Sequence, residues 1–206
     1  MKEIAVYFEG GGDIRETQAQ LRNGMNLFLR TLKDLADARG WRWRLVALGG
    51  REQAYREWQR SVDASPDVLH ILLVDSEAEV SRSPCEHLRN RPGDGWAIKK
   101  AHEPQVHLMA QCMEAWLVAD AEGLAGYYKK GFAVSQLPKR QNLEEEPKTS
   151  IYQALERATS KTKKGAYGKI KHASALLALV DPNKARQRCP HCDRLFATLE
   201  GRFEGA

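Results

Sequence analysis

The hydrophobic and polar positions of the first 80 residues alternate between short apolar runs and longer amphipathic stretches. Residues 3–8 (EIAVYF) form a β-branched and aromatic run, and residues 67–75 (DVLHILLVD) are apolar almost throughout, as in a strand covered on both faces. Residues 41–50 (WRWRLVALGG) begin with strict alternation and end in two glycines. These patterns predict three strands.

Two amphipathic stretches separate these strands. Between residues 16 and 39 apolar side chains recur at helical spacing, and Gly40 follows them, which predicts one helix closed by a glycine. Residues 51–64 (REQAYREWQRSVDA) predict a second amphipathic helix. Strands joined by helices imply a parallel sheet with right-handed crossovers.

The chain continues with a loop and a fourth strand. Residues 81–102 are rich in proline, glycine and charge, and we expect a loop there. Residues 105–111 (QVHLMAQ) predict a strand, and residues 112–120 (CMEAWLVAD) predict a short helix. Asp120 is placed to cap a further helix over residues 121–128.

The second half of the chain reads as helical. A polar connector at residues 137–150 precedes helical patterns at 150–159 and 172–180, and residues 189–201 (CPHCDRLFATLEG) predict a turn followed by a helix. We therefore predict an α/β fold. Its parallel, Rossmann-like sheet flanked by helices occupies residues 1–125, and a basic helical extension, residues 126–206, packs on that core.

Composition limits the class of protein. A chain of 206 residues fits one domain, or one domain with an appendage. No run approaches 18 apolar residues, and the first ten residues (MKEIAVYFEG) lack the apolar region of a signal peptide. The four cysteines are too sparse for a disulfide scaffold. We expect a cytoplasmic protein without membrane spans.

Charge is distributed unevenly along the chain. Residues 1–125 hold 16 Lys and Arg against 19 Asp and Glu, whereas residues 126–206 hold 16 against 8. An acidic half suits metal ions and a basic half suits polyanions, although scattered solvated charge is the simpler alternative.

Acidic residues gather where the predicted strands end. Because ligands collect at the carboxyl ends of parallel strands, carboxylates that follow different strands are expected at one edge. Clustered carboxylates repel one another, so such a cluster persists best around a hard cation, Mg²⁺ or Mn²⁺. The five carboxylates in question belong to Glu9, Asp13, Asp75, Glu77 and Glu114.

The local sequence patterns support this cluster of carboxylates, but they also allow other roles for individual acids. Asp75 and Glu77 share one face of a strand by alternation, and the glycines at 10–12 leave room for a phosphate beside Glu9. Asp13 with Glu16 also fits a helix capping box. Asp75 also fits a plain strand end, Glu77 and Glu79 fit solvated loop charges, and Glu114 fits a surface helix.

These segments resemble a known domain. VYFEGGGD at residues 6–13 followed by LLVDSE at residues 72–77 resembles the Toprim domain, which carries a Glu at the end of its first strand and an acidic pair at the end of its third. QCMEAWLVAD at residues 111–120 is similar to a segment of the OLD and RloB-like Toprim nucleases. The whole chain resembles the DUF4276 family of bacterial proteins. Glu77 departs from the Asp found in many Toprim domains.

The resemblance implies a nuclease that cleaves DNA or RNA with Mg²⁺ or Mn²⁺. Asp75 and Glu77 would hold one ion, and Glu9, Asp13 and Glu114 would hold a second. It also implies a separate ATPase of the ABC/AAA type as partner, in bacterial anti-phage defence; the chain has no P-loop pattern of its own.

A basic segment, residues 161–172 (KTKKGAYGKIKH), carries five lysines, one tyrosine and no acid. We expect it to follow a phosphate backbone, with Tyr167 stacking on a base, although a solvated loop is the alternative. By resemblance one lysine lies beside the metal site as a catalytic residue; Lys169 is our choice, with Lys164 and Lys171 as competitors. The proposed nucleic-acid contacts are Lys161, Lys163, Lys164, Tyr167, Lys169 and Lys171.

Three other interpretations concern a zinc site, a nucleotide-binding enzyme and a non-catalytic subunit. Cys189 and Cys192 have zinc-like spacing, but no second pair of that kind exists, and a structural zinc site needs four ligands. A nucleotide-binding α/β enzyme is disfavoured by the absence of the usual glycine-rich motifs. A non-catalytic subunit that binds nucleic acid or a partner through the same scaffold remains the alternative to a nuclease.

Overall fold

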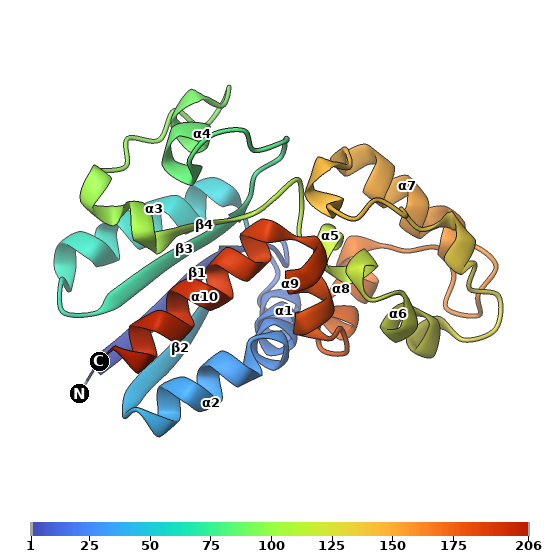
Figure 1. Cartoon of the computed structure of the whole chain (residues 1–206), viewed down its shortest axis with the longest axis horizontal. Coiled ribbons are helices and arrows are strands. Elements are labelled where there is room, and N and C mark those ends of the chain that lie inside the picture. The colour runs from blue at the N-terminus through green and yellow to red at the C-terminus, as the bar shows by residue number, and fades with distance from the viewer. Residues whose placement is uncertain (1, 206) are drawn as a thin grey trace.

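The computed structural model describes residues 2–205 and is built on one parallel sheet (Figure 1). Its strands are β1 (Lys2–Glu9), β2 (Trp41–Leu48), β3 (Leu69–Asp75) and β4 (Val106–Met109), in the order β2-β1-β3-β4. All three pairings are parallel. The predicted α/β class and the parallel sheet flanked by helices are confirmed.

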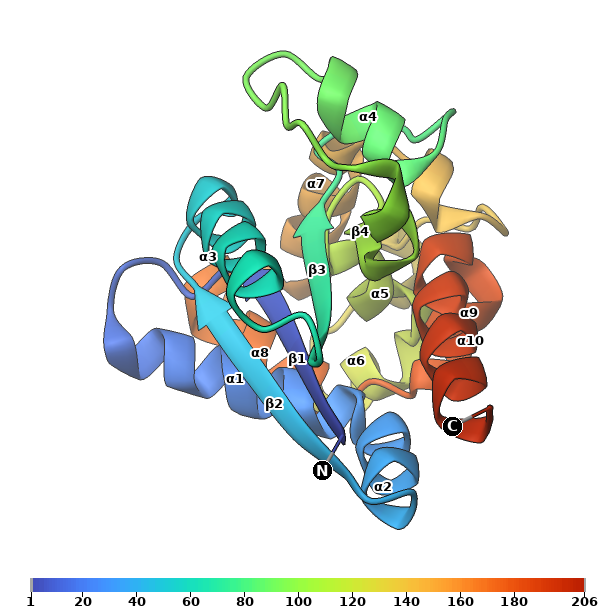
Figure 2. The same ribbon diagram turned by 90° about the vertical axis from the view of Figure 1, so that its left-hand side faces the viewer.

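Helices cover both faces of the sheet (Figure 2). One face carries α3 (Arg51–Ala64), whose Tyr55 stacks on Trp96 with ring centroids 4.4 Å apart. The other face carries α1 (Arg15–Phe28), α2 (Arg30–Ala38) and part of the second half of the chain. Apolar side chains of β1 and β3 alternate between these two cores, which explains why both strands are apolar throughout.

Two predicted elements differ in detail. The single helix expected over residues 16–39 is divided at Leu29, although backbone hydrogen bonds continue through it from Met25 to Lys33. The apolar periodicity persists across the bend, so the sequence pattern does not reveal it. The loop expected at residues 81–102 contains α4 (Pro84–Asn90), which is capped by the Ser83 side chain, and the first half of a 3₁₀ helix, η1 (Lys100–Gln105).

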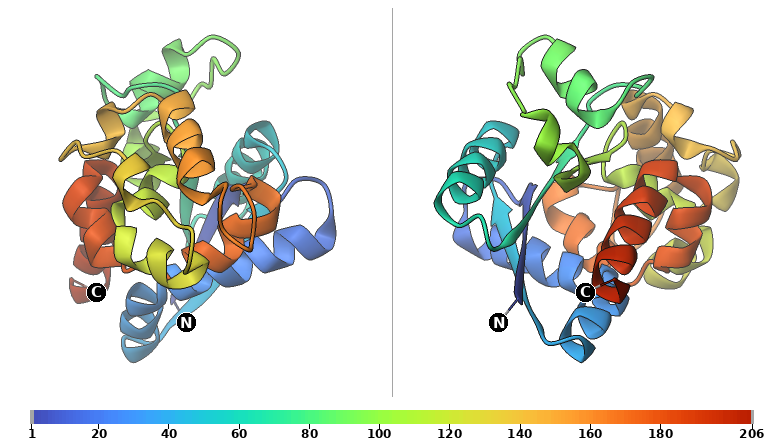
Figure 3. Two further views of the ribbon diagram at one scale, coloured as in Figure 1. Left: turned by 90° about the vertical axis from the view of Figure 1, so that its right-hand side faces the viewer. Right: turned by 60° about the vertical axis from the view of Figure 1, so that its left-hand side comes forward.

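The second half of the chain is helical, as predicted. Its elements are α5 (Glu114–Ala119), α6 (Ala121–Tyr128), η2 (Val134–Gln136), η3 (Leu143–Glu145), α7 (Lys148–Thr159), α8 (Lys169–Leu177), α9 (Pro182–Arg188) and α10 (Pro190–Glu204). Helices α5 to α8 gather beyond the carboxyl end of the sheet (Figures 1 and 3), and α10 lies along β4. Asp120 caps α6 as expected, because its carboxylate accepts from Gly123 N at 3.0 Å.

The helical half shares a core with the sheet. Phe28 of α1 stacks on Trp116 of α5 with centroids 5.2 Å apart and meets Phe196 of α10 edge-on at 5.9 Å. Trp41 of β2 meets Phe203 in the same way at 5.5 Å. These contacts fix the second half against the sheet, and in turn α8 packs on α1 and α7 packs on α5. No helix within residues 2–205 combines the length and apolar character needed to cross a bilayer.

Candidate metal centre

Three carboxylates meet at the carboxyl ends of β1 and β3. Glu9, Asp75 and Glu77 each present an oxygen, and these oxygens lie within 4.8 Å of one another. Glu9 ends β1 and Asp75 ends the neighbouring β3, so the parallel pairing itself brings them together. Glu9 Oε1 accepts a hydrogen bond from Asp75 N at 2.6 Å. Part of the edge predicted from the sequence is therefore formed.

Glu77 reaches this group in a different way from the one we expected. Strand β3 ends at Asp75, so alternation along a strand does not place residue 77. Glu77 instead has a left-handed backbone, with φ of 64°, and this turn brings its side chain to the other two carboxylates. A left-handed conformation is uncommon for a residue other than glycine.

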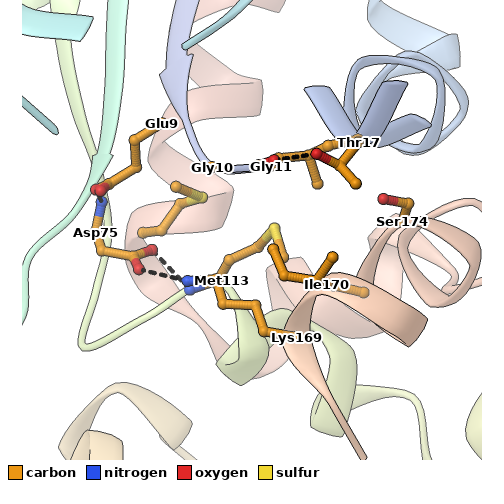
Figure 4. A pocket seen from close by; sticks show the side chains of 12 residues that line it. Glu9, Gly10, Gly11, Thr17, Asp75, Met113, Lys169, Ile170 and Ser174 are labelled. Atoms are coloured by element: carbon orange, nitrogen blue, oxygen red, sulfur yellow. Dashed lines mark hydrogen bonds and ion pairs between the residues drawn. The ribbon is translucent and has the colours of Figure 1, made fainter. Parts of the chain in front are cut away.

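Asp75 lies at the centre of the cluster and is 1% exposed. Its Oδ1 accepts from Met113 N at 2.9 Å, and its Oδ2 lies 3.5 Å from Lys169 Nζ (Figure 4). Burial, with help from Glu114 and Glu77, raises the pKa of Asp75 to about 6, against the opposing effect of the lysines. Burial and the nearby Asp75 likewise raise the pKa of Glu9 to about 8. Carboxyl groups with raised pKa values are under electrostatic stress that a bound cation relieves.

Three cations surround the carboxylates. Lys148 Nζ contacts both oxygens of Glu77 at 2.6 and 2.7 Å, and this pairing lowers the pKa of Glu77 despite its partial burial. Arg51 Nη1 lies 3.4 Å from Glu9 Oε1 and also donates to the backbone oxygen of Asp75. Arg51 is held in turn by Asp94, whose Oδ2 lies 2.6 Å from Nη2. The third cation is Lys169.

Glu114 is buried behind the cluster, not on a helix surface. Its carboxylate accepts from Tyr152 and Tyr167, each at 2.9 Å, and lies 4.0 Å from Lys169 Nζ. It is not among the three carboxylates that lie within 4.8 Å of one another. Glu114 therefore acts on the site through its contact with Lys169 and through its charge, which helps to raise the pKa of Asp75. The hydrogen bond to Glu114 directs the Tyr167 hydroxyl inward. Stacking of Tyr167 on a base would therefore require this hydrogen bond to break.

Asp13 stands apart from the cluster. Its side chain is exposed, its Oδ1 lies beside Gly49, and it does not belong to the three-carboxylate group. The capping box is also not formed, since Ile14 occupies the N-cap position of α1 without any side-chain cap.

The glycines at 10–12 close the loop between β1 and α1. All three have positive φ, which only glycine adopts readily. A Cβ on Gly11 would lie 2.8 Å from Gln18 Cα, and the carbonyls of Gly11 and Gly12 accept from the Thr17 and Gln18 side chains. Beside this loop a narrow cavity of about 20 Å³ is lined by Glu9, Asp75 and Lys169 as well as by Thr17 and Ser174 (Figure 4). That volume holds one or two water molecules.

The basic segment separates into one inner lysine and several outer ones. Lys169, the first residue of α8, reaches the carboxylates, whereas Lys164 and Lys171 do not: Lys164 lies over the Tyr127 ring and Lys171 donates to the Lys164 carbonyl. These two, with Lys161 and Lys163, are exposed on the surface.

The cysteines offer no second metal site among residues 2–205. All four are buried and free, and no group of three His, Cys, Asp or Glu ligands includes any of them. Burial raises the pKa of the Cys189 and Cys192 thiols, as expected for core residues.

Sequence reasoning missed several members of the site. Arg51 follows the two glycines after β2, a position at the carboxyl edge that the strand pattern would have flagged. Lys148 and Tyr152 lie in the polar connector and in α7, where no motif marks them. They enter the site only because α7 lies over the end of β3.

The three carboxylates fit a hard divalent cation. They offer only oxygen ligands, and the pKa values of Glu9 and Asp75 are raised.

Searches of curated proteins and of solved structures gave no match. A model of the family described as a domain of unknown function, DUF4276, matches residues 8–200. The chain belongs to the DUF4276 family.

Proposed function

We propose that this protein is a Toprim-type nuclease that uses Mg²⁺ or Mn²⁺ to hydrolyse phosphodiester bonds in DNA or RNA. The observation that carries the proposal is the convergence of Glu9, Asp75 and Glu77 within 4.8 Å at the carboxyl edge of a parallel sheet. Acids placed at the ends of the first and third strands are the pattern by which the chain resembles Toprim domains.

Glu9, Asp75 and Glu77 would hold the ion. When bound, it supplies positive charge to phosphate oxygens and lowers the pKa of a coordinated water. Hydrolysis adds one water across a P–O bond and leaves a phosphate monoester and a hydroxyl.

The chain's own cations have complementary tasks. Lys169 reaches Asp75 from the rim of the cavity and is 39% exposed, so its ammonium is placed to contact a phosphate oxygen and stabilise charge that develops there. Arg51 is enclosed by Glu9 and Asp94, which suits a fixed counter-charge better than a substrate contact. The outer lysines, Lys161, Lys163, Lys164 and Lys171, would bind the backbone on either side of the cleaved bond.

A cleavage assay tests the proposal. Plasmid, single-stranded DNA and total tRNA would be incubated with Mg²⁺, Mn²⁺ or chelator, comparing wild type with Asp75→Asn and Glu9→Gln. Glu79→Gln is the matched control, because Glu79 is an exposed carboxylate two residues from Glu77. We expect metal-dependent cutting by wild type and the control and a loss of at least 100-fold in the two site variants. Equal cutting by Asp75→Asn would contradict the assignment.

A second candidate is a non-catalytic subunit that uses the scaffold to bind nucleic acid. The observation in its favour is that Lys148, Lys169 and Arg51 already neutralise the carboxylates. By resemblance the partner of either candidate is an ABC/AAA-type ATPase. Nucleic-acid binding without cleavage, both alone and with that ATPase present, and unchanged by Asp75→Asn, would favour the binding role.

A further inference from the structure

Two residues with left-handed backbones face each other at the carboxyl edge of the sheet. Glu77 follows β3 with φ of 64°, and Gln111 follows β4 with φ of 61°. They are joined directly, because Glu77 N donates to the Gln111 carbonyl at 3.1 Å. Such conformations cost free energy in residues other than glycine and persist only where the surroundings impose them. The turn that aims Glu77 at the site is therefore coupled to a second strained residue.

Gln111 connects three separate segments of the chain. Its backbone N donates to Ser76 Oγ at 2.7 Å, which fixes the β3 turn from the other side. Its side-chain Nε2 donates to the Glu144 carbonyl at 3.3 Å, and its Oε1 accepts from Lys148 N at 3.3 Å. The residue is only 5% exposed, and both ends of its amide have partners.

The bond to Lys148 acts at the start of a helix. Lys148 is the first residue of α7, and Pro147 before it has no side chain able to cap the helix. The first backbone N–H groups of a helix lack partners within it, and the side-chain amide of Gln111 supplies one from the turn after β4. The same Lys148 carries its ammonium onto both oxygens of Glu77.

We propose that Gln111 is a positioning residue of the metal centre, which holds Glu77 through its backbone and Lys148 through its side chain and so fixes the Lys148–Glu77 pair. The part that concerns metal binding rests on the proposed function. The contacts themselves do not, since they involve only this chain. Without the amide, the first turn of α7 loses its anchor and the Lys148 ammonium spends less time on Glu77.

The test measures how exposed the Lys148 amine is in metal-free protein. Wild type and Gln111→Met would be labelled with a limiting acylating reagent in chelator, and the modification rate of each lysine would be read by mass spectrometry. Methionine has a length similar to glutamine and leaves the backbone bond to Glu77 in place. We expect Lys148 to react several-fold faster in Gln111→Met, with Lys169 and Lys163 unchanged.

The controls separate positioning from general loosening. Equal Lys148 rates in the two proteins would overturn the proposal, and so would a rise shared by Lys148 and Lys169, since that reports a less stable fold. Thermal unfolding of both proteins checks the same point. In a second arm, Mn²⁺ is expected to speed labelling of Lys148 in wild type by displacing it from Glu77. No effect of Mn²⁺ would count against the metal centre and would leave the comparison made in chelator intact.

Discussion

Lys148 and Glu77 form an ion pair in which Lys148 Nζ lies 2.6 and 2.7 Å from the two carboxylate oxygens of Glu77. Residue 148 opens α7 and residue 77 follows β3, so this pair joins the helical half of the chain to the carboxyl edge of the sheet. The ammonium of Lys148 offsets part of the repulsion among the clustered acids. The pair also means that a cation entering the site competes with an internal ammonium.

Removing that ammonium should strengthen metal binding. In Lys148→Met we expect Mn²⁺ to bind several-fold more tightly than in wild type, because nothing then has to leave Glu77 and one repelling charge is gone. Titration calorimetry with Mn²⁺ measures the change. Lys163→Met, at an exposed lysine, is the control. A weaker affinity in Lys148→Met would show that Lys148 supports the ion instead of competing with it.

Removal of the hydroxyl oxygen of Tyr167 tests the structural role of this residue. Its hydroxyl donates to the buried carboxylate of Glu114 at 2.9 Å, so Tyr167→Phe should lower the free energy of unfolding by about 1–3 kcal/mol. Denaturant unfolding measures this. Tyr128→Phe is the matched control, because the Tyr128 hydroxyl is buried without a partner among residues 2–205 and its loss should be neutral or stabilising.

The same variant also addresses the expected stacking on a base. Phenylalanine keeps the ring, so a stacking role predicts unchanged stability and unchanged affinity for single-stranded nucleic acid. If Tyr167→Phe loses stability and Tyr128→Phe does not, the role of Tyr167 is to hydrogen-bond Glu114.

The outer lysines should govern the salt dependence of nucleic-acid binding. For Lys161→Ala and Lys163→Ala we expect the slope of log K against log salt to fall by about 0.7–0.9 for each residue, the amount that one phosphate contact contributes. Fluorescence anisotropy with a labelled oligonucleotide measures the slope. Lys100→Ala is the control, since Lys100 is exposed on η1, outside the basic segment. Slopes that do not differ from the control would exclude these two lysines from the interface.

His107 makes the fold sensitive to acid. Burial, then Arg194 and His191, lower its pKa to about 3. Its Nδ1 accepts from Arg194 and its Nε2 donates to the Pro104 carbonyl, so the folded state holds the neutral ring. The unfolded chain takes up this proton near pH 6.5, so stability is full above that pH and is lost as the pH falls toward 3.

The slope from this residue reaches about 1.4 kcal/mol per pH unit. In His107→Asn the free energy of unfolding should therefore fall less steeply between pH 6.5 and pH 4 than in wild type. Urea unfolding at several pH values makes the comparison. Parallel curves for the two proteins would mean that His107 does not contribute to acid sensitivity.

Much of the sheet and part of the site could be predicted from the sequence, because both depend on local patterns. Apolar runs place β1 and β3, and the acids that end them, Glu9 and Asp75, are brought together by the parallel pairing of neighbouring strands. Glu77 was predicted for a reason that proved wrong, since a left-handed turn and not strand alternation directs it inward. Asp13 fits the sequence pattern but lies outside the cluster, because the glycine loop closes against α1 and leaves its side chain at the surface.

What the sequence determined by itself was the order of strands and helices and the two acids fixed by strand ends, since hydrophobic period and residue type act over a few neighbouring positions. Only the tertiary structure showed that Lys148 and Arg51 lie beside those acids, and it selected Lys169 from the three lysines that the resemblance left in competition. Lys148 and Lys169 come from helices 70 to 100 residues further along the chain than Glu77 and Asp75, and Gln111 ties the first of these helices to the sheet. Their approach depends on how α7 and α8 pack beyond the sheet, and no local pattern records a contact of that kind.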